Sequence, residues 1–241
     1  MIKLGKGTAF KNEAWMLEYL QRQSSLSVPE VDYADDHLMI MTYIEGNSQL
    51  NRKAQIDAAG QIARLHQIKG SRFGLSRDTV IGGLKQVNTE TDLWIPFFRE
   101  QRLIYMAKMA HQSGKLNTKL FERILKFAED VHDYIQEAPY PALIHGDLWT
   151  GNILQAQGKI VGFLDPAIYY AHPEIELAFS TLFHTFDQSF FETYQQINPI
   201  EKGFFEVRRD IYNLYPLLVH VCLFGQSYAS SIESILSHLG Y

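Results

Sequence analysis

Hydrophobic positions recur at helical spacing over most of the chain and in short strand-like runs elsewhere. An amphipathic pattern predicts a first helix at residues 10–21, and an apolar run predicts a strand at Leu38–Met41, after an extended stretch that opens at Pro29. Helical spacing returns at residues 54–67, 93–109, 118–135, 175–186 and 205–224. This order of elements predicts an α+β fold with a small N-terminal part and a larger helical part.

A predicted hairpin interrupts the helical part. Apolar runs on both sides of Gln157-Gly158, a pair typical of a tight turn, indicate its two strands. Another short apolar run, Ala142–Ile144, precedes the hairpin. Asp147 follows this run and Asp165 follows the hairpin, so we expect both carboxylates to lie at strand ends.

Three polar residues stand here at the spacing of a kinase catalytic loop. Asp147 and Asn152 are five residues apart, as are the base and the metal-binding amide of H-R-D-x-x-x-x-N, and Asp165 comes where kinases have the metal-binding Asp of Asp-Phe-Gly. Gly146 replaces the Arg, and Asp-Pro replaces Asp-Phe-Gly. His-Gly-Asp alone is also typical of a structural turn, whereas the full set favours phosphoryl transfer.

The residue types suit this chemistry. Phosphoryl transfer depends on positioning and on neutralising phosphate charge, usually by magnesium that bridges the β- and γ-phosphates. Asn152 and Asp165 can supply hard oxygens to Mg²⁺, which keeps several waters and takes its other ligands from the substrate phosphates. We predict Asn152 and Asp165 as metal ligands, and Asp147 as the catalytic base that orients the acceptor hydroxyl and takes its proton.

These motifs resemble those of a known family. Residues 145–152 read His-Gly-Asp-Leu-Trp-Thr-Gly-Asn, residues 165–170 read Asp-Pro-Ala-Ile-Tyr-Tyr, and residues 172–178 read His-Pro-Glu-Ile-Glu-Leu-Ala. They are similar to the fructosamine kinase (ketosamine-3-kinase) branch of the aminoglycoside phosphotransferase and choline kinase group, over nearly the whole chain. The resemblance implies a protein-kinase-like fold of two lobes. Residues 1–45 would form a truncated N-terminal sheet lobe that binds nucleotide, and residues 46–241 an α-rich catalytic and acceptor-binding lobe.

The resemblance also implies ATP and Mg²⁺ as cofactors. Lys3 and Glu13 match the ion pair in which a lysine contacts the α- and β-phosphates and a helix glutamate holds the lysine. Met41, Tyr43 and Ile44 match the hinge whose backbone bonds adenine in the kinase group. The alternative that Lys3 and Glu13 are ordinary surface charges stays open.

A family member implies two more strands and a glycine-containing loop before this lysine, and the sequence has only Met1-Ile2 there. Gly5-Lys6-Gly7 follows the lysine and is too short to replace that loop. We therefore expect an uncovered sheet edge. Because uncovered edges pair with other chains, the sequence predicts self-association through the N-terminal sheet.

For the acceptor, the resemblance implies a ketosamine, a sugar–amine adduct phosphorylated on the sugar 3-hydroxyl, either free or on a glycated protein. Its amine is cationic near neutral pH, so Trp149, Tyr169 and Tyr170 are predicted to stack on the substrate. Glu174 and Glu176 are predicted to add negative charge near the pocket. The alternatives are that the aromatic residues form core or wall, and that Glu176 is a structural cap.

Composition narrows the classes of partner and location. The 241 residues are 46% hydrophobic and 20% charged, which is enough for a substantial core. A net charge of −5 gives no basic footprint for nucleic acid, and no apolar stretch is long enough to span a bilayer. The N-terminus lacks a signal-peptide core, and the single cysteine, Cys222, suits a reducing compartment. We expect a cytoplasmic protein without nucleic-acid or membrane partners.

Three functions remain open at this point. The favoured one is an ATP-dependent ketosamine 3-kinase. The second is a truncated homologue without kinase activity, acting as a binding protein or being a fragment, because the glycine-containing loop is not found. The third is a kinase for another small amine-containing alcohol, which would share the catalytic set and differ at the acceptor. The Asp-Leu-Trp and Asp-Pro-Ala-x-Tyr-Tyr patterns argue against this third function.

Overall fold

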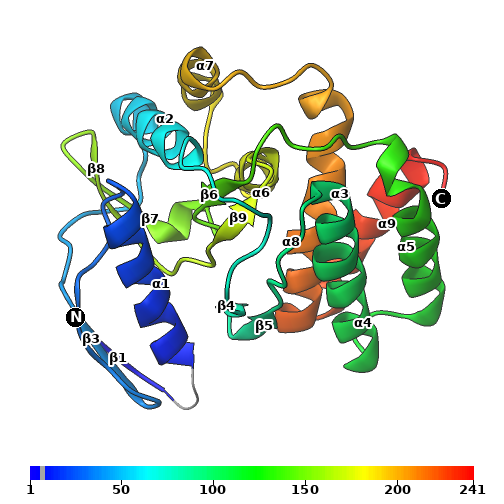
Figure 1. Cartoon of the computed structure of the whole chain (residues 1–241), viewed down its shortest axis with the longest axis horizontal. Helices are drawn as coiled ribbons and strands as arrows, with labels where there is room; N and C mark the ends of the chain where they lie inside the picture. The colour runs from blue at the N-terminus through cyan, green and yellow to red at the C-terminus, as the bar shows by residue number, and fades with distance from the viewer. Residues whose placement is uncertain (6–8) are drawn as a thin grey trace.

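The N-terminal part is a small antiparallel sheet packed against one helix, α1 (Ala9–Gln23) (Figure 1). Its strands stand in the order β1 (Ile2–Leu4), β3 (Leu38–Met41), β2 (Val31–Ala34). The computed structural model describes residues 1–5 and 9–241. Of the Gly5-Lys6-Gly7 segment, Lys6 and Gly7 therefore lie outside the described residues.

Helix α1 is buried on two sides, and each side packs against a different part of the chain. Ala14 and Leu17 pack with Met39 and Met41 of β3 in a small cluster. Met16, which lies between them in sequence and points to another side of the helix, belongs to the main core that runs through the rest of the chain. Burial on both sides therefore ties the sheet to the helical part. Strand β1 lies at one edge of this sheet, and self-association through that edge stays a prediction.

Three two-stranded antiparallel pairs follow. They are β4 (Thr79–Ile81) with β5 (Leu84–Gln86), β6 (Ala142–Ile144) with β9 (Tyr169–Ala171), and β7 (Ile153–Ala156) with β8 (Lys159–Phe163). The β7–β8 turn has positive φ at both Gln157 (53°) and Gly158 (79°), as tight hairpins require. The predicted hairpin and the predicted strand Ala142–Ile144 are thus confirmed.

Helices make up most of the remaining chain. They are α2 (Arg52–His66), α3 (Trp94–Phe97), α4 (Tyr105–Gln112), α5 (Thr118–Asp130), α6 (Glu174–Leu182), α7 (Gln188–Ile197), α8 (Arg209–Phe224) and α9 (Ala229–His238). A π-helical segment, Phe98–Ile104, joins α3 to α4, and another, Phe204–Arg208, leads into α8. In Figure 1 the N-terminal sheet lies at one end, α5 and α9 at the other, and β6 and β9 between them. Within the described residues, no helix combines the length and apolar character needed to cross a membrane.

The helix predictions hold better for position than for length. The helix predicted at 118–135 ends earlier, at Asp130, and the one predicted at 175–186 ends at Leu182. The structure adds elements that the sequence did not indicate, namely α7, α9, β9 and the β4–β5 hairpin. The α+β class is confirmed, and the lobe boundary after residue 45 stays a prediction.

Candidate active site

The loop after β6 is shaped by a close backbone approach. Gly146 has φ of 85°, and a Cβ atom there would lie 2.0 Å from the carbonyl oxygen of Ala167. The Ala167 N–H donates to the His145 carbonyl at 2.8 Å, which joins this loop to the one after β8. Only glycine fits such an approach, so the glycine of His-Gly-Asp is required by packing.

Asp147 and Asn152 are brought into direct contact. The Asn152 Nδ2 donates to Asp147 Oδ2 at 2.8 Å and to the Asp147 carbonyl at 2.9 Å. The Leu164 N–H donates to the Asn152 carbonyl at 2.8 Å, immediately before Asp165. The three predicted chemical residues are therefore linked through one network of short bonds.

Asp165 contacts the N-terminal sheet, which is distant from it in sequence. Its backbone is left-handed, with φ of 50°, a conformation that aspartate tolerates better than most residues. Its side chain is half exposed, and its carboxylate contacts Lys3 Nζ. Lys3 also pairs with Glu13 at 2.6 Å, so the predicted Lys3–Glu13 pair forms. Burial opposes the effect, but the charges of Glu13 and Asp165 raise the pKa of Lys3 above its ordinary value.

The groups that could hold a metal are few. Among residues 1–5 and 9–241, no three His, Cys, Asp or Glu side chains group closely enough to bind an ion alone. Asp165 offers a carboxylate, and Asn152 has its amide nitrogen committed to Asp147, which leaves the amide oxygen for another partner. Two oxygen donors fit Mg²⁺, which relies on phosphates and water for its remaining ligands.

Asp147 has the electrostatics of a base near neutral pH. Burial raises the pKa of Asp147 to about 7, and the charges of Asp165 and Glu176 act in the same direction, against the hydrogen bond from Asn152. A general base works best when its pKa lies near the working pH. The carboxyl is therefore suited to accept a proton from a bound hydroxyl.

Glu176 supports the loop from beneath. Its carboxylate is fully buried and accepts from the N–H groups of Gly146, at 2.6 Å, and His145, at 3.2 Å. It also accepts from His66 Nε2 at 2.8 Å, and the hydroxyl of Tyr194 lies 2.7 Å from His66 Nδ1. Glu176 is thus a structural cap of the catalytic loop, which is the alternative role that the sequence left open for it.

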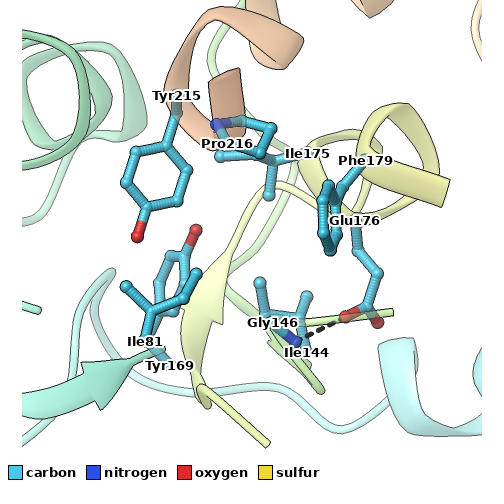
Figure 2. A pocket seen from close by; sticks show the side chains of 9 residues that line it. All are labelled: Ile81, Ile144, Gly146, Tyr169, Ile175, Glu176, Phe179, Tyr215 and Pro216. Atoms are coloured by element: carbon cyan, nitrogen blue, oxygen red, sulfur yellow. Dashed lines mark hydrogen bonds between the residues drawn. The ribbon is translucent and has the colours of Figure 1, made fainter. Parts of the chain in front are cut away.

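A small cavity lies behind this cap. Figure 2 shows the Gly146–Glu176 bond at one side and the rings of Tyr169 and Tyr215 at the other. The cavity measures about 10 Å³, too little for a substrate. Tyr169 is 1% exposed, and the Arg102 guanidinium lies 3.8 Å from its ring centre. Tyr169 therefore belongs to the core, and its predicted role in binding substrate is wrong.

A second, larger pocket opens beside Asp147. It has a volume of about 290 Å³, and we call it the acceptor pocket because Asp147, the predicted base for the acceptor hydroxyl, lines it. Its lining comes from the catalytic loop, the β4–β5 turn, α6, α8 and the segment after α8. The lining residues are Ile81, Gly82, Asp147, Trp149, Phe179, Phe183, Pro216, Val219, His220, Leu223, Phe224 and Tyr228. Trp149 thus lines the same pocket as Asp147, and its contact with the substrate stays a prediction.

Two other predicted substrate contacts lie elsewhere. The Tyr170 hydroxyl is 3.1 Å from that of Tyr19 on α1, and its ring packs over Gly70. Glu174 is 3% exposed and forms a two-bond ion pair with Arg208, at 2.6 and 2.7 Å. Neither residue lines the acceptor pocket, so both predictions are corrected.

The residues that sequence reasoning missed carry a periodic signal. Phe179 and Phe183 are four apart, as are His220 and Phe224. Side chains at this spacing share one helix face. Aromatic pairs at that spacing near the C-terminal ends of α6 and α8 could have indicated a common wall, although the sequence does not say that the two faces meet.

The predicted nucleotide hinge is placed only in part. The Met41 N–H donates to the Met1 carbonyl and the Met1 amino group donates to the Met41 carbonyl, so the backbone of Met41 is engaged within the sheet. This differs from the predicted adenine contact. Tyr43 is 70% exposed, and Ile44 packs over Gly162 of β8. The hinge therefore runs across the catalytic hairpin, and adenine contacts by Tyr43 and Ile44 stay predictions.

We expect a buried histidine near α6 to make the protein acid-sensitive. Burial lowers the pKa of His172 to about 3, with Arg208 adding to the effect, whereas the unfolded side chain titrates near 6.5. Between these values the unfolded state binds more protons, so stability falls as pH is lowered. Urea unfolding at pH 7 and 5 should show a loss from this group of about 2 kcal/mol. The His172→Asn variant should lose that much less over the same interval; an unchanged difference would contradict the assignment.

The comparisons with known proteins agree with this geometry. A family model described as fructosamine kinase matches residues 4–240. A protein of Enterococcus faecium named as a probable ketoamine kinase is 37% identical over 185 residues, which cover 76% of this chain and 66% of that protein. The chain thus spans just under two thirds of the length of that relative.

Solved structures share the fold. A Thermobifida fusca protein assigned as a fructosamine-3-kinase has a TM-score of 0.88 at 28% identity, covering 98% of this chain and 83% of that one. An aminoglycoside phosphotransferase mutant in complex with ADP and hygromycin B has a TM-score of 0.66 at 15% identity, covering 93% and 82%, which shows the fold alone. The predicted protein-kinase-like fold is therefore confirmed. From the family match across residues 4–240, the chain belongs to the fructosamine kinase family of kinase-type phosphotransferases.

Proposed function

We propose that this chain transfers the γ-phosphate of ATP to the 3-hydroxyl of a ketosamine. The observation that carries the proposal is the position of Asp147. It lines the acceptor pocket and also bonds Asn152, whose backbone joins the strand end that carries Asp165. Acceptor and phosphate-handling groups thus meet at one carboxylate.

Each residue has a role in this scheme. Asp147 holds the acceptor hydroxyl and takes its proton as the oxygen attacks the γ-phosphorus. Lys3, held by Glu13, contacts the nucleotide phosphates. Asn152 and Asp165 would hold Mg²⁺, which neutralises phosphate charge when bound. The ADP complex of the aminoglycoside phosphotransferase supports a nucleotide as the donor.

The exposure of the acceptor pocket bears on the form of the acceptor. Trp149, Phe183 and Phe224 at the acceptor pocket are 39%, 36% and 66% exposed, so the pocket opens to the surface. Such an opening admits either a free ketosamine or a sugar adduct on a protein lysine.

We also propose the cytoplasm as the location, on the grounds of the single cysteine, Cys222, and the composition.

The direct test is transfer of radiolabel from γ-labelled ATP to a small fructosamine, with and without Mg²⁺. We expect a labelled sugar phosphate only when Mg²⁺ is present, and periodate cleavage or NMR should place the phosphate on the 3-oxygen. A folded chain that transfers no label would favour the homologue without kinase activity. Transfer to an amino alcohol but not to a ketosamine would favour the other small-molecule kinase.

Removing the charge of Lys3 should weaken catalysis through the nucleotide. In Lys3→Met we expect kcat/KM for ATP to fall about 100-fold, because a preorganised cation no longer faces the phosphates. The control is Lys11→Met, since Lys11 forms an exposed pair with Asp36. Steady-state kinetics with varied ATP measures both. Equal kinetic constants for Lys3→Met and the unaltered chain would remove the proposed role.

A further inference from the structure

The acceptor pocket also carries information about the amine half of the substrate. Resting on the proposed function, we infer that this chain prefers ketosamines whose nitrogen bears an apolar substituent, such as a benzyl group, over those whose substituent carries a charge.

The first argument is a continuous set of rings along one side of the pocket. Trp149 and Phe183 have ring centres 6.1 Å apart, and Phe183 and His220 are 5.1 Å apart. His220 lies 4.9 Å from Tyr228 and 5.5 Å from Phe224. We call these five residues the aromatic wall. Ring faces of this kind bury an adjoining apolar group.

The second argument is the absence of charge partners. Among the described residues that line the pocket, Asp147 is the single carboxylate, and neither Lys nor Arg is present. His220 Nδ1 donates to the Pro216 carbonyl at 2.7 Å, and burial lowers the pKa of His220, which keeps its ring neutral. A second charge on the substrate would therefore lose part of its hydration against the aromatic wall without gaining an ion partner in the pocket. Such a loss is unfavourable.

The third argument is exposure at the pocket mouth. A volume of about 290 Å³ is small for a ligand site, so a bulky substituent must extend toward the opening. There Phe224 is 66% exposed and Phe183 is 36% exposed, an apolar surface that an apolar substituent would cover.

The test compares three fructosamines that share the sugar, made from benzylamine, glycine and ethylenediamine. With ATP saturating, we expect kcat/KM for the benzyl adduct to exceed the other two by about 10- to 100-fold, mostly through KM. Transfer to all three with equal or reversed preference would overturn the inference and leave the proposed function standing. Transfer to none of them, from a folded chain that binds ATP, would overturn both.

Variants locate the preference in the aromatic wall. In Phe224→Ala the benzyl-to-glycine ratio of kcat/KM should fall at least fivefold, since an exposed ring that covers the substituent is removed. The matched control is Phe205→Ala, because Phe205 is a 40% exposed phenylalanine outside the pocket lining. An unchanged ratio in both Phe224→Ala and Phe183→Ala would assign the preference elsewhere and overturn the role of the wall.

Discussion

Replacing Asp147 by Asn should lower kcat for phosphoryl transfer by about 10³- to 10⁴-fold, because the base that takes the acceptor proton is lost. The amide presents an NH₂ group either to the acceptor or to the Asn152 Nδ2 donor, so it cannot act as the base. Because the amide is close to the carboxylate in shape, we expect the fold and ATP binding to persist. A coupled assay of ADP formation measures kcat, and calorimetry with a non-hydrolysable ATP analogue measures binding.

The matched control is Asp133→Asn, which removes a carboxylate whose side chain is 68% exposed and outside the acceptor pocket. Its kcat should equal that of the unaltered chain. If Asp147→Asn kept a tenth or more of the activity, Asp147 would not be the base, and proton transfer to solvent or to phosphate would replace it.

Replacing Glu176 by Ala should lower the free energy of unfolding by about 3–5 kcal/mol, as expected when one partner of a buried charged network is removed. The loss has a specific origin. The N–H groups of His145 and Gly146 and the Nε2 of His66 would all lose their acceptor, and His145 and His66 are fully buried. Activity should fall as well, because these bonds hold the loop that carries Asp147.

Urea unfolding at pH 7 measures the change. Glu233→Ala serves as the control, since Glu233 is exposed on α9, and its midpoint should be nearly unchanged. Glu176→Gln should lose less stability than Glu176→Ala, because one amide oxygen can still accept from Gly146. If Glu176→Ala unfolded at the same urea concentration as the unaltered chain, Glu176 would not cap the loop.

The catalytic loop shows how far local sequence reaches. Asp147, Asn152 and Asp165 lie within one strand–turn–hairpin segment, so their spacing and turn residues determine that they meet. Gly146 had to be glycine for a backbone contact only 21 residues away in the chain, with Ala167. Lys3 and Glu13 are similarly close in sequence, and their pairing was implied by the family resemblance and is present.

The acceptor side could not be read in the same way. Tyr169 and Glu174 follow the catalytic hairpin directly, yet Arg102 and Arg208, from other helical segments, hold them in the core. Which face of a segment is buried depends on the partner that covers it, and the partner comes from elsewhere in the chain.

The sequence alone determined the family, the α+β class and the chemical groups, because these depend on residue types at short, fixed spacing. The tertiary structure decided the contact between Lys3 and Asp165, 162 residues apart, and the meeting of α6 and α8 that forms the aromatic wall. Local turns are set by the backbone preferences of neighbouring residues. A pocket is set by the packing of distant faces, which no single segment encodes.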